Sequence, residues 1–157
     1  MTNSVIRIGV ISDTHGLLRP EAVKVLRGSD MILHAGDVCG FEVVEALREI
    51  APVTAVRGNN DHDPWGSSLP ETVTLDVGGV RVHMLHDLHL LAIDPRAEGV
   101  RVVVAGHSHQ PMREIRQGIL HFNPGSAGPR RFHLPISLGR LVVRDGRVSA
   151  RVVTLAP

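Results

Sequence analysis

Residues 8–16 read I-G-V-I-S-D-T-H-G, a short apolar run that stops abruptly in polar side chains. The apolar stretch 6–11 predicts a buried strand near the start of a domain. Asp13 and His15 follow two positions apart, so a backbone that stayed extended would point both side chains the same way. A carboxylate and an imidazole aimed together form half of a metal site. The same tetrapeptide also suits a plain turn, so its meaning depends on the rest of the chain.

The chain has 157 residues and a net charge of +1, which predicts one domain, residues 1–157, and gives no electrostatic reason for a nucleic-acid or membrane partner. The single cysteine, Cys39, leaves no internal disulfide and is typical of a reducing compartment. The N-terminus leads directly into the first predicted strand, without room for a signal peptide, and no apolar run approaches the ~20 residues of a membrane span. We therefore expect a cytoplasmic protein.

The first half of the chain alternates between strand and helix patterns. Strands are predicted at 6–11, 31–35 and 53–56, and helices at 20–27 and 41–50. This alternation predicts parallel βαβ units with ligands bound beyond the carboxyl ends of the strands.

The second half is richer in strands. Residues 65–71 are expected to form a loop, and Gly78-Gly79 indicates a hairpin between 73–77 and 80–85. Further strands are predicted at 100–105 and 120–123, and a second hairpin at 139–155 turns at Asp145-Gly146. The whole pattern favours a mixed α/β sandwich.

Polar side chains with oxygen or nitrogen ligands stand where five of these predicted strands end. They are Asp13, His15, Asp37, Asn59, His86, His107 and His109. The carboxyl ends of parallel strands share one edge, so we expect the seven to converge on one pocket. Seven ligands exceed the needs of one ion but suit two ions that share a carboxylate, and Asp37 is the natural bridge because a carboxylate has two oxygens.

In chain order the blocks Asp13-x-His15, Gly36-Asp37, Gly58-Asn59-x-Asp61, His86 and Gly106-His107-x-His109 resemble the calcineurin-like metallophosphoesterase superfamily. The additional Asn123-Pro124-Gly125-Ser126 is similar to the small bacterial and archaeal phosphodiesterase branch of that superfamily. The resemblance runs from the first strand to about Arg131. It implies a two-sheet mixed β-sandwich flanked by helices, in the order α-β-β-α. It also implies one ion on Asp13, His15 and His109, a second on Asn59, His86 and His107, and Asp37 between them.

The function expected from these residues is a dinuclear-metal-dependent phosphodiesterase, in which a hydroxide bridging the two ions attacks phosphorus in line with the leaving oxygen. The candidate catalytic residues are Asp37, Asn60 and Asp61, and the candidate substrate-binding residues are Asn60, Arg130 and Arg131. Many members of the family carry a histidine where Asn60 stands. An amide cannot donate a proton near neutral pH, so this chain should favour leaving groups of low pKa.

Two divalent ions are the expected cofactors, with Mn²⁺ as the first choice and Fe²⁺, Zn²⁺ or Ni²⁺ as alternatives, because the ligand set contains no thiolate. The expected partner is a small phosphodiester substrate; nucleic acid is disfavoured but left open, as is formation of a homo-oligomer. Two further readings remain open at this point. One is a phosphomonoesterase or nucleotide phosphatase with the same site. The other is a non-catalytic scaffold, since the fold resembles that of a retromer coat subunit with a degraded metal site.

Two more residues near the motifs have open roles. Asp87, where the same branch commonly has glycine, would either orient an imidazole or add negative charge near the ions. Asn123 is expected to order its own turn rather than to bind metal. Arg130 and Arg131 also have a plain reading as solvated surface side chains.

Overall fold

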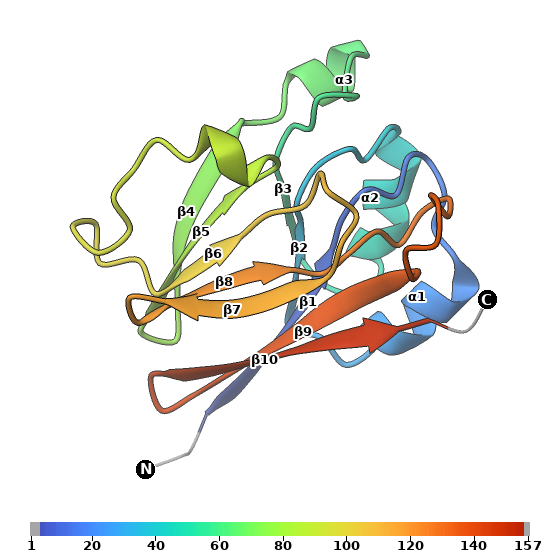
Figure 1. Cartoon of the computed structure of the whole chain (residues 1–157). Helices are drawn as coiled ribbons and strands as arrows, with labels where there is room; N and C mark the ends of the chain where they lie inside the picture. Colours follow the sequence, from blue (N-terminus) through green and yellow to red (C-terminus); the bar gives the residue numbers. More distant parts are fainter. Residues whose placement is uncertain (1–3, 156–157) are drawn as a thin grey trace.

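A computed structural model of the chain describes residues 4–155. Two five-stranded mixed sheets face each other, as the sequence predicts (Figure 1). The first sheet has the order β10-β9-β1-β2-β3. Its strands are β1 (Val5–Ile11), β2 (Met31–His34), β3 (Val53–Ala55), β9 (Ser137–Arg144) and β10 (Arg147–Thr154). β1, β2 and β3 run parallel, which confirms the predicted βαβ units; β9 pairs with β1, and β10 with β9, in antiparallel fashion.

The second sheet has the order β4-β5-β6-β8-β7. Its strands are β4 (Thr72–Val77), β5 (Val80–Leu85), β6 (Val102–Val104), β7 (Met112–Arg116) and β8 (Ile119–Asn123). β5, β6 and β8 run parallel, and β4 and β7 form antiparallel edges. The short edge strand β7 was not predicted, because its residues are mostly exposed and carry no buried face.

The main core lies between the two sheets. It is made of inward-facing side chains such as Val10, Leu33, Met84 and Phe122, all 0 or 1% exposed. A second apolar layer on the outer face of the first sheet is covered by α1 (Pro20–Leu26) and α2 (Phe41–Arg48), as Figure 1 shows. The outer face of the second sheet is covered by the 3-10 turn η1 (Leu88–Leu90) and the loop after it. None of the helices in residues 4–155 is long and apolar enough to cross a membrane.

Both predicted hairpins are present. Gly78 and Gly79 have φ of 54° and 84°, and Asp145 and Gly146 have φ of 52° and 72°, the left-handed conformations that a two-residue hairpin turn requires. The expected loop at 65–71 differs, because α3 (Pro64–Ser67) occupies its start. Asp63 caps this helix by accepting a hydrogen bond from the Gly66 N–H, and Pro64 occupies its first turn. Asp-Pro at a helix start is a local signal that hydrophobic periodicity does not detect.

Candidate metal centre

The loops that follow the parallel strands of both sheets carry the predicted ligands. Asp13, His15 and Asp37 have φ of 55°, 46° and 56°, and His107 and His109 have φ of 69° and 62°. The extended backbone expected between Asp13 and His15 is therefore wrong. Left-handed conformations cost an ordinary side chain some free energy, and Asp, Asn and His tolerate them better than most residues. Here they turn successive side chains inward within a few residues of a strand end.

The first predicted trio of ligands is assembled. Oδ1 of Asp13 lies 3.9 Å from Nε2 of His15 and 3.4 Å from Nε2 of His109. The three ligand atoms lie within 4.8 Å of one another, an arrangement able to hold a metal ion.

The second trio lies beside the first, around Asp37. Oδ2 of Asp37 is 3.3 Å from Nε2 of His86 and 3.7 Å from Nε2 of His15, so this carboxylate faces imidazoles of both trios. Nδ1 of His107 lies 3.3 Å from Nε2 of His86 and 3.2 Å from Oδ1 of Asn59. The structure thus places the seven predicted ligands in one cluster, in which both Asp37 and Asp13, whose Oδ1 lies 3.8 Å from Nε2 of His86, face imidazoles of both trios.

The two carboxylate oxygens of Asp13 differ in their hydrogen bonding. Oδ2 accepts hydrogen bonds from the Ser12 hydroxyl at 2.7 Å and from the His107 backbone N–H at 3.1 Å. Oδ1, in contrast, is buried without a hydrogen-bond partner, and so is Nε2 of His15. Buried polar atoms are rarely left unpaired. Carboxylate oxygen and imidazole nitrogen that face each other without bonding fit a divalent cation between them.

Charge coupling at the centre is strong. Burial alone would raise the pKa of Asp37, but the His86 imidazole and two hydrogen bonds from Asn60 outweigh burial and hold that pKa well below its usual range. The pKa of Asp13 is likewise lowered against the effect of burial, by His109, His86 and Ser12. Both carboxylates are thus ionised near neutral pH, as metal ligands must be.

A hydrogen-bond acceptor orients one imidazole of the second trio, and a carboxylate lies near the other. The carbonyl of Ala35 accepts a hydrogen bond from Nδ1 of His86 at 2.7 Å, which fixes the ring orientation so that Nε2 faces Asp37. Oδ2 of Asp87 lies 3.8 Å from Nε2 of His107, on the side away from Asn59. Because this distance exceeds that of a hydrogen bond, Asp87 adds negative charge near His107, and its Oδ1 accepts instead from the His89 backbone N–H at 3.0 Å.

The predicted catalytic residue Asp61 lies beneath the centre, 1% exposed. Its Oδ2 accepts hydrogen bonds from the backbone N–H groups of Asp37 at 3.0 Å, Val38 at 3.4 Å and Gly58 at 2.8 Å. Its Oδ1 accepts one from Cys39 at 2.9 Å. Asp61 therefore ties together the two loops that carry Asp37 and Asn59, which is the geometry of a positioning residue.

Asn123 orders its surroundings, as expected from the sequence. Its Oδ1 accepts a hydrogen bond from the Gly125 N–H at 2.9 Å, and its Nδ2 donates to the Gly106 carbonyl at 3.0 Å. Ser126 extends this support by donating to the Asp13 carbonyl at 3.1 Å. The Asn-Pro-Gly-Ser turn thus braces the Asp13 and His107 loops from behind.

The two predicted substrate-binding arginines differ in placement. Arg130 donates to the Leu134 carbonyl at 3.4 Å, within its own loop. Arg131 is close enough to His15 for its positive charge to contribute, after burial, to a lowered pKa of that imidazole. A third arginine was missed: Arg57 lines a hollow of about 240 Å³ beside His86, Asn59 and His107. Its position in the sequence, just before the Gly58-Asn59 block, could have indicated that it lies beside the metal centre.

Comparison with known proteins identifies the family of this chain. The family model described as the calcineurin-like phosphoesterase superfamily domain matches residues 6–146. A protein of Methanocaldococcus jannaschii named a probable metallophosphoesterase is 33% identical, covering 94% of this chain and 81% of the relative. Phosphodiesterase YfcE of Escherichia coli is 32% identical, covering 83% of this chain and 84% of its own.

A solved structure with a similar fold carries a different description. It is wild-type Vps29 of Entamoeba histolytica complexed with Zn²⁺, which superposes with a TM-score of 0.72 at 25% identity, over 95% of this chain and 99% of that one. The relatives named as phosphoesterases support phosphoester hydrolase activity in general. The match over residues 6–146 and the identity to these two relatives establish that the chain belongs to the calcineurin-like phosphoesterase superfamily.

Proposed function

We propose that this protein is a phosphodiesterase that uses two divalent metal ions. The observation that carries the proposal is the convergence of seven ligand side chains, two of which, Asp13 and His15, each present a buried atom without a hydrogen-bond partner to the cluster. Family membership implies divalent metal ions, and the donor set fits them. A mere structural cluster of ionised carboxylates and buried imidazoles would leave these atoms with an unrelieved desolvation cost.

One ion would be held by Asp13, His15 and His109, and the other by Asn59, His86 and His107, with Asp37 shared. When bound, the ions supply positive charge for the phosphoryl oxygens and lower the pKa of water toward neutrality, so that hydroxide is available as nucleophile. Mn²⁺ is our first choice, with Fe²⁺, Zn²⁺ and Ni²⁺ as alternatives; Zn²⁺ gains support from the description of the Vps29 structure.

The protein's own groups position the substrate. Asn60 uses one amide hydrogen on Asp37 and has a second to donate to a phosphoryl oxygen. Arg131 and Arg57 lie on different sides of the centre, and each guanidinium is suited to bind a phosphate oxygen pair. No histidine takes the place of Asn60, so the leaving group departs without a proton from this position, which favours esters with stable leaving groups.

The preference for a diester rests on the relative YfcE, named as a phosphodiesterase. The hollow of about 240 Å³ between Arg57 and Leu90 supports it further, because it offers room beside the centre for the second ester group. A phosphomonoesterase or nucleotide phosphatase with the same site is the nearest alternative. We propose a small phosphodiester as the substrate and the cytoplasm as the compartment.

A scaffold function is the second candidate, favoured by the likeness to Vps29. In its favour, the fold agrees over nearly the full length of both chains. Against it, five of the seven ligands are held in left-handed backbone conformations, and their loops are braced by Asp61 and Asn123, which costs free energy with no use in a scaffold.

The test is hydrolysis by metal-stripped protein to which Mn²⁺, Ni²⁺, Zn²⁺ or Mg²⁺ is added back. Bis-p-nitrophenyl phosphate and p-nitrophenyl phosphate are compared as substrates, and Asp37→Ala serves as the variant without the shared carboxylate. The proposal expects turnover to return with a transition metal, to favour the diester and to be lost in the variant. A preference for the monoester supports the phosphatase alternative, and failure to bind any metal in elemental analysis supports the scaffold.

A further inference from the structure

The outer face of the first sheet carries arginines in opposed pairs. On the antiparallel strands β9 and β10, Arg140 stands opposite Arg151, and Arg144 stands opposite Arg147. Residues directly opposite in an antiparallel pair point to the same face, and like charges in that position destabilise the sheet. Two such pairs in succession therefore need a reason.

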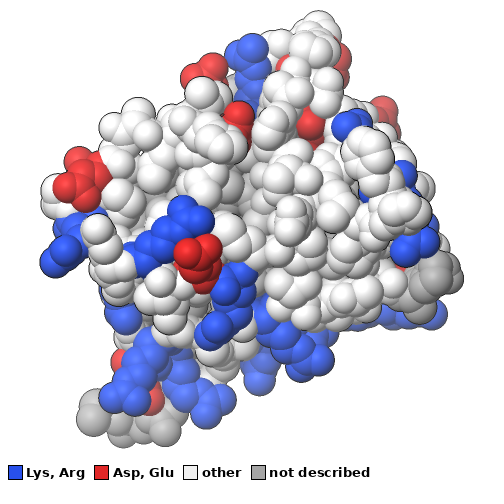
Figure 2. Space-filling model, viewed as in Figure 1, with Lys and Arg blue, Asp and Glu red and all other residues white. Residues whose placement is uncertain are grey.

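Successive side chains along a strand point to opposite faces of the sheet, and this alternation shows which face the arginines occupy. Leu141 and Ala150, the chain neighbours of Arg140 and Arg151, pack in the core between the two sheets. Arg140 and Arg151 consequently point outward, and Arg7 of β1 joins them, because its neighbour Ile8 also lies in that core. Figure 2 shows Lys and Arg side chains gathered along the lower edge of the molecule, next to β10.

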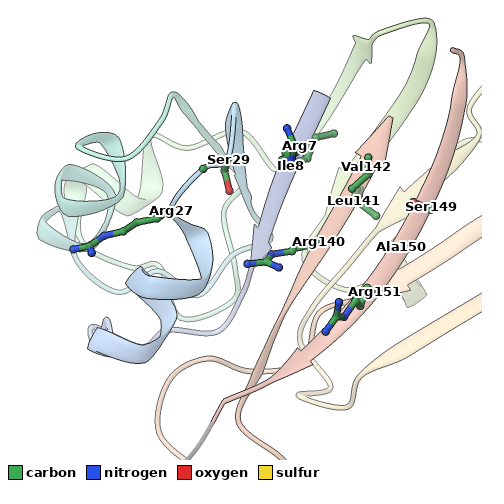
Figure 3. Close-up of a pocket in the computed structure, with 11 residues that line it drawn as sticks. Arg7, Ile8, Arg27, Ser29, Arg140, Leu141, Val142, Ser149, Ala150 and Arg151 are labelled. Atoms are coloured by element: carbon green, nitrogen blue, oxygen red, sulfur yellow. The ribbon is translucent and has the colours of Figure 1, made fainter. Parts of the chain in front are cut away.

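A hollow of about 500 Å³ lies on this face, between the sheet and the segment that follows α1. It is lined by the guanidinium-bearing residues Arg7, Arg140 and Arg151 and by the hydroxyl-bearing residues Ser29 and Ser149. Figure 3 shows Arg140 and Ser29 directed toward each other from β9 and from the end of α1, with Arg151 extending on the same side of the sheet. The guanidinium of Arg27, a further lining residue, is directed away.

The arginines that line this hollow form no ion pair with a carboxylate of residues 4–155. Over residues 4–155, the ion pairs that arginine makes are Arg81 with Asp76 and Arg116 with Glu114. Arg140 donates to the Val25 carbonyl at 2.7 Å, which uses one of its five N–H groups. The nearby carboxylate of Asp30 accepts from the backbone N–H of Arg7 at 2.7 Å and forms no ion pair with its guanidinium.

We propose that this hollow binds a small molecule with a chain of linked phosphate groups, at a site separate from the metal centre. Guanidinium groups bind phosphate oxygens in pairs, and a run of linked phosphates would neutralise the opposed arginines that the sheet otherwise holds at a cost. A hollow of about 500 Å³ has the size of a small-molecule site. The lining contains no aromatic side chain, so the phosphate chain, rather than an attached base, is what the site recognises.

The site lies well away from the metal centre. Arg7 precedes Ile11, the last residue of β1, by four positions, roughly 13 Å along an extended strand, and Asp13 lies in the loop beyond; the Arg7 side chain projects from the outer face. The inference does not rest on the proposed phosphodiesterase activity, and the two can be tested apart.

The experiment is a calorimetric titration of metal-stripped protein with tripolyphosphate. The wild type is compared with Arg140→Thr/Arg151→Thr and with the matched control Arg48→Gln, an exposed arginine on α2. We expect binding by the wild type and the control, and at least tenfold weaker binding by the double variant. Hydrolysis of bis-p-nitrophenyl phosphate by metal-loaded double variant should equal that of the wild type, since neither arginine lies at the metal centre.

Additional ligands separate the sources of such a phosphate chain. ATP binding as tightly as tripolyphosphate, with AMP much weaker, identifies the linked phosphates as the recognised group; ATP binding far more tightly identifies a nucleotide as the ligand. Equal affinity of the double variant and the wild type overturns the proposal. So does binding of a single-stranded oligonucleotide, dependent on the same arginines, when tripolyphosphate does not bind.

The variant's stability gives an independent reading. Removing an opposed pair of like charges should leave the melting temperature of the unliganded double variant at or above that of the wild type. Tripolyphosphate should raise the melting temperature of the wild type and not of the double variant. If the double variant does not fold, Arg151→Thr alone, on the edge strand β10, provides the same comparison, and an unchanged ligand-induced rise in that variant counts against the site.

Discussion

The side-chain amide of Asn60 donates a hydrogen bond to Oδ2 of Asp37 across 3.0 Å, and the backbone N–H of Asn60 donates to Oδ1 of the same carboxylate at 2.8 Å. Asn60 thus donates a hydrogen bond to each oxygen of the carboxylate that we propose as the ligand shared by the two ions. Its amide helps to hold the pKa of Asp37 below the usual range, together with His86 and against the effect of burial. The residue that replaces the family's histidine is therefore a ligand-orienting group with no proton to give.

The first prediction follows from the absence of a proton donor at position 60. The rate of diester hydrolysis should fall steeply as the pKa of the leaving group rises, because no acid at position 60 assists its departure. Asn60→His should reduce this slope and speed hydrolysis of alkyl esters relative to nitrophenyl esters. The measurement is kcat/KM over a series of aryl and alkyl diesters for both proteins. Identical slopes would show that position 60 plays no part in protonating the leaving group.

The second prediction concerns Asp61. Asp61→Ala leaves four backbone N–H groups without their acceptor and should lower the free energy of unfolding by about 3 kcal/mol. It should also reduce kcat/KM by roughly a hundredfold, because Asp37 and Asn59 lose their fixed relative position. Urea unfolding and bis-p-nitrophenyl phosphate hydrolysis measure the two effects.

Asp63→Ala is the matched control for that experiment. It removes the cap of α3, where Asp63 accepts from the Gly66 N–H at 3.1 Å, and should cost about 1 kcal/mol with little change in activity. Equal losses of activity in the two variants would contradict the positioning role of Asp61.

The third prediction is a pH dependence of stability from His34. This imidazole is fully buried between Thr14 and the Gly36 N–H, and burial lowers its pKa from 6.5 to about 4. Between pH 6.5 and pH 4, His34 is protonated in the unfolded chain and neutral in the folded protein. The contribution of His34 to the free energy of unfolding is therefore fully present above about pH 6.5 and is lost as the pH falls toward 4. The total decrease in the free energy of unfolding is about 3 kcal/mol.

Urea unfolding of metal-stripped protein at several pH values measures this loss. His34→Gln has no titrating group at this position and should show a correspondingly flatter dependence between pH 6.5 and 4. Parallel curves for the two proteins would assign the acid sensitivity to other groups.

The fourth prediction concerns the reactivity of Cys39. Burial, followed by the negative charges of Asp61 and Asp37, raises the pKa of the Cys39 thiol to about 11. The thiolate fraction at pH 8 is then small, so iodoacetamide should alkylate metal-stripped protein at least about tenfold more slowly than the urea-unfolded chain. Mass spectrometry of timed samples gives both rates. A folded rate close to the unfolded one would mean that Cys39 is accessible as thiolate, at odds with its surroundings.

Both hairpins and all the strands except β7 could be predicted from the sequence, because each depends on local pattern, while the metal-ligand set stays a prediction. Apolar runs mark buried strands, Gly78-Gly79 and Asp145-Gly146 allow the left-handed turns of hairpins, and polar residues at strand ends mark a binding edge. The order of the motifs was enough to assign the family, which the comparison with known proteins confirms.

Other features depend on contacts between segments far apart in the chain, and only the tertiary structure decided them. The left-handed backbone at Asp13 and His107 is stable because the loops of two sheets brace each other, as in the hydrogen bond from the His107 N–H to Asp13. The same holds for Asp61, whose role depends on three N–H groups of the Asp37 loop and one of its own loop. The arginines of β9 and β10 are ordinary surface residues in the sequence; the antiparallel register sets them opposite one another and turns single charges into a shared site.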